Sequence, residues 1–255
     1  MDADERYIVG PVMKALKVLD AIAEKGHPVS LTTVAAELGL PKTSTFRYLR
    51  TLSAAGFASY DPASDRYAVG TRFRALATAD KSIQRLRALA LPALAALNRE
   101  FNETINLAVI ADHQVAYIDI LESTRALRMQ ARVGSRDPLH STALGKAMLA
   151  HLPVEERGAL LSHALAQRTL RTITELRVIE RQLQEVARTG VAIEIGENEE
   201  GTMCIGVAIL DEGRRPLAAI SLSAPERRIT DPLRERVVAR LKEAAAAISE
   251  GLLQP

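Results

Sequence analysis

Residues 31–57 read LTTVAAELGLPKTSTFRYLRTLSAAGF, and this stretch predicts two helices separated by a very short turn. Ser30 is a suitable N-cap for the first helix, and Gly39 supplies the left-handed residue that ends it. Pro41 suits the first turn of the second helix, because its missing N–H would have no partner there. Two helices joined in this way are typical of a helix-turn-helix, in which the second helix enters the major groove of DNA.

The second helix has an inward face and a free face. The inward face carries Thr45, Tyr48, Leu49 and Leu52, and the free face carries Thr43, Arg47, Arg50 and Ala54. Arg47 and Arg50 are candidates for contacts with guanine edges or phosphates. Phe46 is expected either to touch a thymine methyl group or to pack against the neighbouring hairpin. The candidates for DNA contact in this region are Lys42, Thr43, Ser44, Thr45, Phe46, Arg47, Arg50, Thr51 and Arg66, with Lys42, Thr43 and Ser44 placed to hold phosphate.

A hairpin is predicted after the second helix. Residues 57–60 and 66–69 have strand composition, and the Asp-Pro-Ala-Ser-Asp sequence between them predicts a turn. A hairpin in this place makes a winged helix. Between Lys42 and Arg74 six basic residues stand against two acidic ones, which leaves a local net charge of +4. The whole chain carries only +2, so any affinity for a polyanion has to come from this local patch.

Composition narrows the remaining possibilities. The 255 residues, 47% of them hydrophobic, are comfortable for two domains. The single cysteine, Cys204, allows no intramolecular disulfide, and the sequence has no zinc-ligand spacing, so we expect a cytoplasmic protein without a structural metal. The N-terminus has no apolar run of signal-peptide or membrane-spanning length. A winged helix that binds another protein instead of DNA remains an alternative.

Helices are also predicted before and after the winged helix. Residues 12–23 place Val12, Ala15, Leu16, Leu19 and Ile22 on one apolar stripe, and Gly26 ends that helix. Residues 71–100 predict one helix that leaves the hairpin and a second that starts near Pro92. Such a connector, facing its symmetry mate, would both dimerise the chain and carry a signal to the winged helix.

Beyond residue 101 strands alternate with helices. Strands are predicted at 104–110, 115–120, 127–132, 191–195, 202–210 and 216–223. Ser141 or Thr142 is expected to cap a helix that runs through Leu149, Thr174 to cap another, and a further helix to end the chain. A mostly antiparallel sheet with helices packed against it, an α+β sensor-like domain, accounts for this order.

An enzyme with an N-terminal DNA-targeting module is the second alternative. Potential nucleophiles and bases are present at His140, Ser141, Cys204, Ser221 and Ser223, but the sequence has no G-x-S-x-G elbow and gives no order for a triad. Gly145-Lys146 lacks the first glycine of a phosphate loop, because His140 stands in its place. Cys204 lies in an apolar strand, where a buried, unreactive thiol is expected. We therefore expect no enzymatic activity.

Three stretches resemble the IclR family of bacterial transcriptional regulators. They are LGLPKTSTFRYLRTL at 38–52, RVGSRDPLHSTALGKAMLA at 132–150, and ENEEGTMCIGVAIL at 197–210 followed by LAAISLSAP at 217–225. The resemblance covers essentially the whole chain. It implies a winged helix-turn-helix domain at 1–75, a linker and dimerisation helix region at 76–100, and a GAF-like α/β effector-binding domain at 101–255.

The resemblance also implies partners. They are double-stranded operator DNA, a small organic or aromatic acid as effector, and further copies of the chain in a homodimer or homotetramer, with no cofactor and no membrane. Effector binding is expected to change the arrangement of the DNA-binding helices and so the affinity for the operator. Whether the result is repression or activation stays open.

Site residues follow from the resemblance by position. The effector cavity would be lined by Met129, Ala143, Leu144, Glu194, Thr202, Cys204, Ser221 and Ser223, which gives alkyl walls and two serine hydroxyls. Arg132 and His140 are candidates for neutralising a carboxylate, or else are structural groups. Glu194 stands where the family usually has Asp. Lys14 stands where the family usually has Arg, and is a candidate phosphate contact without bidentate geometry.

Overall fold

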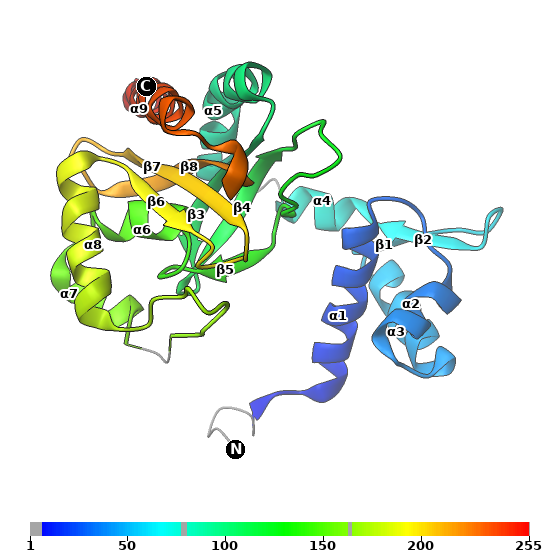
Figure 1. Cartoon of the computed structure of the whole chain (residues 1–255). Helices are drawn as coiled ribbons and strands as arrows, with labels where there is room; N and C mark the ends of the chain where they lie inside the picture. Colours follow the sequence, from blue (N-terminus) through cyan, green and yellow to red (C-terminus); the bar gives the residue numbers. More distant parts are fainter. Residues whose placement is uncertain (1–6, 78–80, 163–164, 255) are drawn as a thin grey trace. The chain divides into compact units, whose positions relative to one another are not determined.

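The computed structural model describes residues 7–77, 81–162 and 165–254, and the chain divides into two compact units (Figure 1). The first unit comprises residues 1–81 and the second residues 82–255. Each unit has a hydrophobic core of its own. None of the described helices is both long and apolar enough to cross a membrane.

The N-terminal unit is a winged helix. Its elements are α1 (Gly10–Lys25), α2 (Leu31–Leu38), α3 (Lys42–Ala54), β1 (Ala58–Asp61), β2 (Arg66–Val69) and α4 (Thr71–Ala77). The predicted cap of α2 is confirmed, because the Ser30 side chain accepts a hydrogen bond from the backbone N–H of Thr33 over 3.2 Å. Gly39, with φ of 61°, ends α2 in the left-handed conformation as predicted. Strands β1 and β2 pair antiparallel and form the expected hairpin.

The predicted stripe on α1 is wrong over its first half. Val12 and Leu16 are 56% and 49% exposed, whereas Val18 and Ala21 are buried. The core of the unit contains α1 residues only from Val18 onward, so burial follows the position of the packing partners and not the helical period alone.

The C-terminal unit contains a six-stranded antiparallel sheet in the order β5-β4-β3-β8-β7-β6. Its strands are β3 (Thr104–Ala111), β4 (Gln114–Leu121), β5 (Arg136–Pro138), β6 (Ala192–Ile195), β7 (Thr202–Leu210) and β8 (Pro216–Pro225). Its helices are α5 (Lys81–Phe101), α6 (Ala143–Leu149), α7 (Val154–Leu160), α8 (Leu176–Thr189), the 3-10 turn η2 (Glu226–Arg228) and α9 (Asp231–Leu253). The structure has the predicted α+β class.

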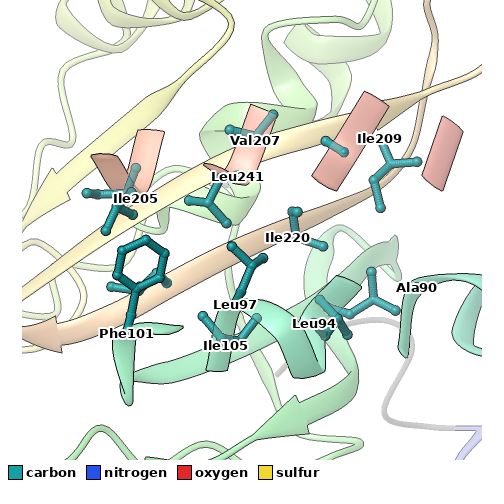
Figure 2. Close-up of a cluster of buried hydrophobic side chains, with 14 of the residues drawn as sticks. Ala90, Leu94, Leu97, Phe101, Ile105, Ile205, Val207, Ile209, Ile220 and Leu241 are labelled. Atoms are coloured by element: carbon teal, nitrogen blue, oxygen red, sulfur yellow. The ribbon is translucent and has the colours of Figure 1, made fainter. Parts of the chain in front are cut away.

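Two faces of this sheet have different partners (Figure 1). Helices α5 and α9 cover one face, where alternate strand residues such as Ile105, Ile205 and Ile220 are fully buried. Figure 2 shows Leu94 and Leu97 of α5 and Leu241 of α9 among these strand residues. Helices α6 and α8 cover the opposite face with a second core. Since successive strand residues point to opposite faces, strands such as β3 and β7 supply both cores.

The predicted break at Pro92 is wrong. Helix α5 runs without interruption from Lys81, and Pro92 lies inside it. Leu86, Leu94 and Leu97 are buried in the core on one side of the sheet, and this packing outweighs the one backbone hydrogen bond that proline removes. The predicted linker of residues 76–100 is therefore divided, since its residues from 82 onward belong to the C-terminal unit.

Two further local predictions are wrong. Residues 127–132 form no strand, because carbonyl groups there accept hydrogen bonds from side chains: Met129 O from the Thr104 hydroxyl over 2.9 Å, and Leu127 O from the Arg228 guanidinium over 2.9 Å. Helix α8 begins at Leu176 after Glu175, so Thr174 is not its cap.

Candidate nucleic-acid interface and ligand cavity

The free face of α3 carries unpaired positive charge. Lys42, Arg47 and Arg50 are exposed, and none of them forms an ion pair with any residue that the structure describes. Elsewhere the arginines are commonly paired, as Arg157 is with Glu180 at 2.8 Å. Cations that hold no protein partner can bind phosphate or base edges without first breaking an ion pair.

The structure places the other α3 candidates individually. Thr43 and Thr51 are exposed, and Ser44 is half-buried at the start of the helix. Phe46 is 50% exposed and does not belong to the core of its unit, which leaves its ring free for an outside contact. Thr45 has to be corrected: it is fully buried, and its hydroxyl donates to the carbonyl of Pro41 over 3.1 Å, so it is not available to DNA.

The wing is held together by its own polar groups. The Tyr60 hydroxyl donates to the Asp65 carboxylate over 3.0 Å, and hydrogen bonds from Ser64 and from the Ala63 backbone hold the pKa of Asp61 below its ordinary value. Arg66 donates to the carbonyl of Pro28 over 3.3 Å while staying exposed.

The remaining candidate for DNA contact, Lys14, is exposed on α1.

A cavity of about 60 Å³ lies in the C-terminal unit, between the sheet and the start of α6. Its lining comprises Thr104, Asn106, Tyr117, Met129, Gln130, Ala131, Asp137, Thr142, Ala143, Leu144, Glu194, Asn198, Glu199, Thr202, Cys204, Ser221 and Ser223. Because one water needs about 10–15 Å³ on this measure, the space suits a ligand of a few heavy atoms.

The floor of the cavity is a row of residues across four neighbouring strands. Strand pairing places Thr104 opposite Ser223, Ser223 opposite Cys204, and Cys204 opposite Glu194. Asn106 lies one position further along the same face and donates from its amide to the hydroxyl oxygens of both Ser221 and Ser223 over 3.1 Å. The amide oxygen of Asn106 is buried and has no partner among the described residues.

Helix α6 forms the opposite wall and sits very close to the sheet. Thr142 caps it, since its hydroxyl accepts from the backbone N–H of Gly145 over 3.1 Å and donates to the carbonyl of Pro138 over 2.9 Å. Of the two caps considered, Ser141 or Thr142, the structure thus has Thr142. A Cβ on Gly206 would lie 2.7 Å from the carbonyl oxygen of Ala143, so the sheet needs glycine at this position.

Electrostatics inside the cavity favour protonated groups. Burial raises the pKa of Glu194 to about 7, while the hydrogen bond that its carboxylate accepts from the backbone of Glu197 opposes this shift. Burial and the neighbouring Glu194 carboxyl raise the pKa of the Cys204 thiol. Burial likewise raises the pKa of Tyr117, whose hydroxyl donates to Asp137 over 2.9 Å. A protonated Cys204 is a poor nucleophile.

The nearest buried cation is already paired. Lys146 of α6 is 1% exposed and forms an ion pair with Glu197. Thr172 fixes the same segment, because its hydroxyl donates to the carbonyl of Glu197 over 2.7 Å. Lys146 is therefore neutralised by Glu197 outside the cavity lining. The lining itself contains no lysine, arginine or histidine.

All of the predicted effector residues except Arg132 and His140 line this cavity. Arg132 is exposed and lies outside the lining. His140 is buried, and its Nε2 atom lies 3.1 Å from the carbonyl of Ala166. Burial lowers the pKa of His140, which favours the neutral imidazole. Of the two roles considered for His140, this environment and its place outside the lining favour a structural group.

Several lining residues were missed from the sequence, among them Thr104, Asn106, Tyr117, Asp137, Asn198 and Glu199. A signal existed for two of them. Thr104 and Asn106 alternate with apolar residues in the strand TINLAVIA, and this alternation marks polar side chains on one sheet face. Tyr117 and Asp137 meet only through the pairing of β4 with β5, which no local pattern predicts.

Comparison with known proteins agrees with this architecture. Residues 11–62 match the family described as IclR helix-turn-helix domain, and residues 80–250 match Bacterial transcriptional regulator IclR C-terminal. The chain is 34% identical over 229 residues to the transcriptional repressor IclR of Escherichia coli (strain K12), covering 88% of this chain and 82% of that protein.

Two solved structures extend the comparison. The IclR of Thermotoga maritima superimposes with a TM-score of 0.77 at 31% identity, covering 94% of this chain and 98% of that one. An IclR homolog from Microbacterium hydrocarbonoxydans, solved in complex with 4-hydroxybenzoate, gives a TM-score of 0.78 at 26% identity, covering 95% and 99%.

A winged helix with a free basic helix face, followed by an α/β unit, defines a DNA-binding transcriptional regulator. The matches to both units place it more narrowly: the chain belongs to the IclR family of bacterial transcriptional regulators.

Proposed function

We propose that this regulator binds a small organic acid in the cavity of its C-terminal unit, and that binding changes the affinity of the winged helix for double-stranded operator DNA. The observation that carries the proposal is the cavity itself, which is small, lies between sheet and helix, and is lined by polar groups from β3, β6, β7 and β8. The 4-hydroxybenzoate complex of the Microbacterium hydrocarbonoxydans homolog supports an organic acid as ligand.

Within the proposal the DNA contacts come from Lys14, Lys42, Thr43, Ser44, Phe46, Arg47, Arg50, Thr51 and Arg66. Arg47 and Arg50 read the major groove, and the residues at the start of α3 hold phosphate. Effector contacts come from the predicted residues that line the cavity, with Ser221 and Ser223 orienting the ligand. The chain works in the cytoplasm, where the operator is, and acts without enzymatic turnover, in line with the protonated Cys204.

We also propose a homodimer or homotetramer. Operators with two half-sites need two recognition helices. Apolar side chains lie exposed at the start of α1 and just before it, namely Tyr7, Ile8, Val9, Val12 and Leu16. Exposed apolar groups that gather in one place mark contact surfaces between proteins.

The test is a fluorescence-anisotropy titration of the full-length protein against its own upstream DNA and against a scrambled duplex, at two salt concentrations, with and without small carboxylic and aromatic acids. The proposal expects sequence-specific binding that at least one acid shifts. Equal, salt-sensitive binding to both duplexes in the presence of every acid would contradict it, and would favour a winged helix that binds protein.

A further inference from the structure

The ionisable charged side chains that line the cavity are all acidic. Asp137, Glu194 and Glu199 line it, and no basic side chain does. Lys146, the nearest buried cation, is paired with Glu197 outside the lining. A carboxylate ligand therefore enters a site that already contains carboxyl groups, and two ionised carboxylates in contact repel strongly away from water.

Glu194 is the carboxyl group that would be most strongly affected by this repulsion. It is 1% exposed at the end of the floor row, whereas Glu199 is exposed to solvent. One carboxylate oxygen of Glu194 is fixed by the backbone N–H of Glu197 over 2.8 Å. Its other neighbours are Cys204 on β7, Tyr117 on β4, Lys146 on α6 and the Glu197 side chain. A hydrogen bond from Cys204 and the charge of Lys146 favour the ionised form of Glu194, and the charge of the Glu197 side chain opposes it.

A second observation concerns Asn106, a polar residue of β3 on the cavity floor. The amide nitrogen of Asn106 donates to both Ser221 and Ser223, whereas its amide oxygen is buried and lacks a partner among the residues described here. Asn106 is only 3% exposed and lines the cavity. A buried acceptor without a donor is destabilising, and a hydroxyl group on the ligand would supply the missing hydrogen bond.

We propose that the cavity binds a small hydroxy acid together with one proton, which Glu194 holds and donates to the bound carboxylate while Asn106 accepts from the ligand hydroxyl. The inference rests on the proposed function, since it assumes that the effector is an acid. The proton comes from solvent: ionised Glu194, one proton and the acid anion become protonated Glu194 hydrogen-bonded to that anion. The O–H bond formed on Glu194 is the only covalent change in this step. Glu194 thus sets the pH range in which the regulator senses its effector.

The expected direction follows from linkage. The pKa of Glu194 in the free protein is about 7, and a bound anion raises it further. Below that value Glu194 is already protonated and affinity is flat with pH. Above it each binding event requires the uptake of one proton, so the affinity falls by up to about tenfold for each unit that the pH rises.

Calorimetric titration of the full-length protein with glycolate and with lactate tests this, using acetate as the probe that lacks a hydroxyl. We expect binding about tenfold weaker near pH 8 than near pH 6. Close to one proton should be taken up near pH 8, measured in two buffers of different ionisation enthalpy. Acetate should bind more weakly than glycolate.

Two variants sharpen the test. Glu194→Gln mimics the protonated side chain and should bind glycolate with an affinity that no longer depends on pH. Glu200→Gln, at an exposed position on the loop that follows β6 and outside the lining, should keep the wild-type pH dependence. The buffer comparison needs no variant, so it decides the matter even if Glu194→Gln fails to fold. Binding without proton uptake overturns this inference alone, whereas no binding of any acid at either pH overturns the proposed acid effector as well.

Discussion

Individual residues decide where this protein carries usable charge. Arg47 and Arg50 are exposed without ion-pair partners in the described parts of the chain, while Arg157 is tied to Glu180 by two hydrogen bonds of 3.1 and 2.8 Å. Breaking such a pair would offset much of what a new phosphate contact gains. Binding capacity therefore follows from the absence of partners as much as from the presence of arginine.

The first prediction concerns these two arginines. Arg47→Ala or Arg50→Ala should weaken binding to the specific operator by about 1–3 kcal/mol, because each change removes a major-groove or phosphate contact. Anisotropy titrations with operator and scrambled duplexes measure the effect. Arg181→Ala on α8, also exposed, is the matched control and should change neither affinity. Unchanged operator binding by both α3 variants would remove this helix from the interface.

Glu194 also makes stability depend on pH. The folded protein raises its pKa from 4.5 to about 7, so the folded state holds a proton that the unfolded state has lost between these values. The contribution of Glu194 to the free energy of unfolding is fully present below pH 4.5 and is lost as the pH rises through 7, by roughly 3 kcal/mol in total. Glu194→Gln should escape this loss. Urea unfolding of both proteins across this range gives the comparison, and parallel curves would show that Glu194 titrates normally.

Elements meet at distances that only small residues permit. Gly206→Ala would place a methyl group 2.7 Å from the carbonyl oxygen of Ala143, and this backbone atom would have to move. We expect a loss of about 1–3 kcal/mol in unfolding free energy together with weaker acid binding, because α6 moves off the sheet. Gly158→Ala in α7, where nothing lies within 4 Å, should be neutral or slightly stabilising. Equal effects of the two substitutions would contradict the close-packing argument.

Helices and strands also differ in how well the sequence predicts them, depending on whether local or distant residues determine the structure. Local signals sufficed for the helix-turn-helix, since Ser30 and Gly39 act at the ends of α2 through their own chemistry. They failed at Pro92 and at residues 127–132, where distant groups decide: the core beneath α5 in one case, and the Thr104 and Arg228 side chains in the other.

The cavity, too, could be predicted only in part. The resemblance supplied the lining residues on β6, β7, β8 and α6, but the row from Thr104 to Glu194 exists only because β3, β8, β7 and β6 are neighbours in an order that differs from the sequence. Its carboxyl-rich character was also unexpected, because Asp137 and Glu199 reach the cavity from a short strand and a loop.

As a whole molecule the chain is two units with separate cores. A fragment of residues 82–255 should therefore fold, unfold in one cooperative transition, and bind acid as the full chain does while having no affinity for the operator. Calorimetry and acid titration of fragment and full-length protein test this. An unfolded fragment would mean that the N-terminal unit contributes to the stability of the C-terminal one.

The alternation along β3, β7 and β8 has a consequence for evolution. Thr104 and Asn106 face the cavity, whereas Ile105 and Leu107, which alternate with them along β3, belong to the core on the other side. Ligand preference and foldability are thus encoded at interleaved positions of the same strands. A lineage, or a selection experiment that randomises only the cavity-facing positions, can retune what the regulator detects while the supporting layer stays as it is.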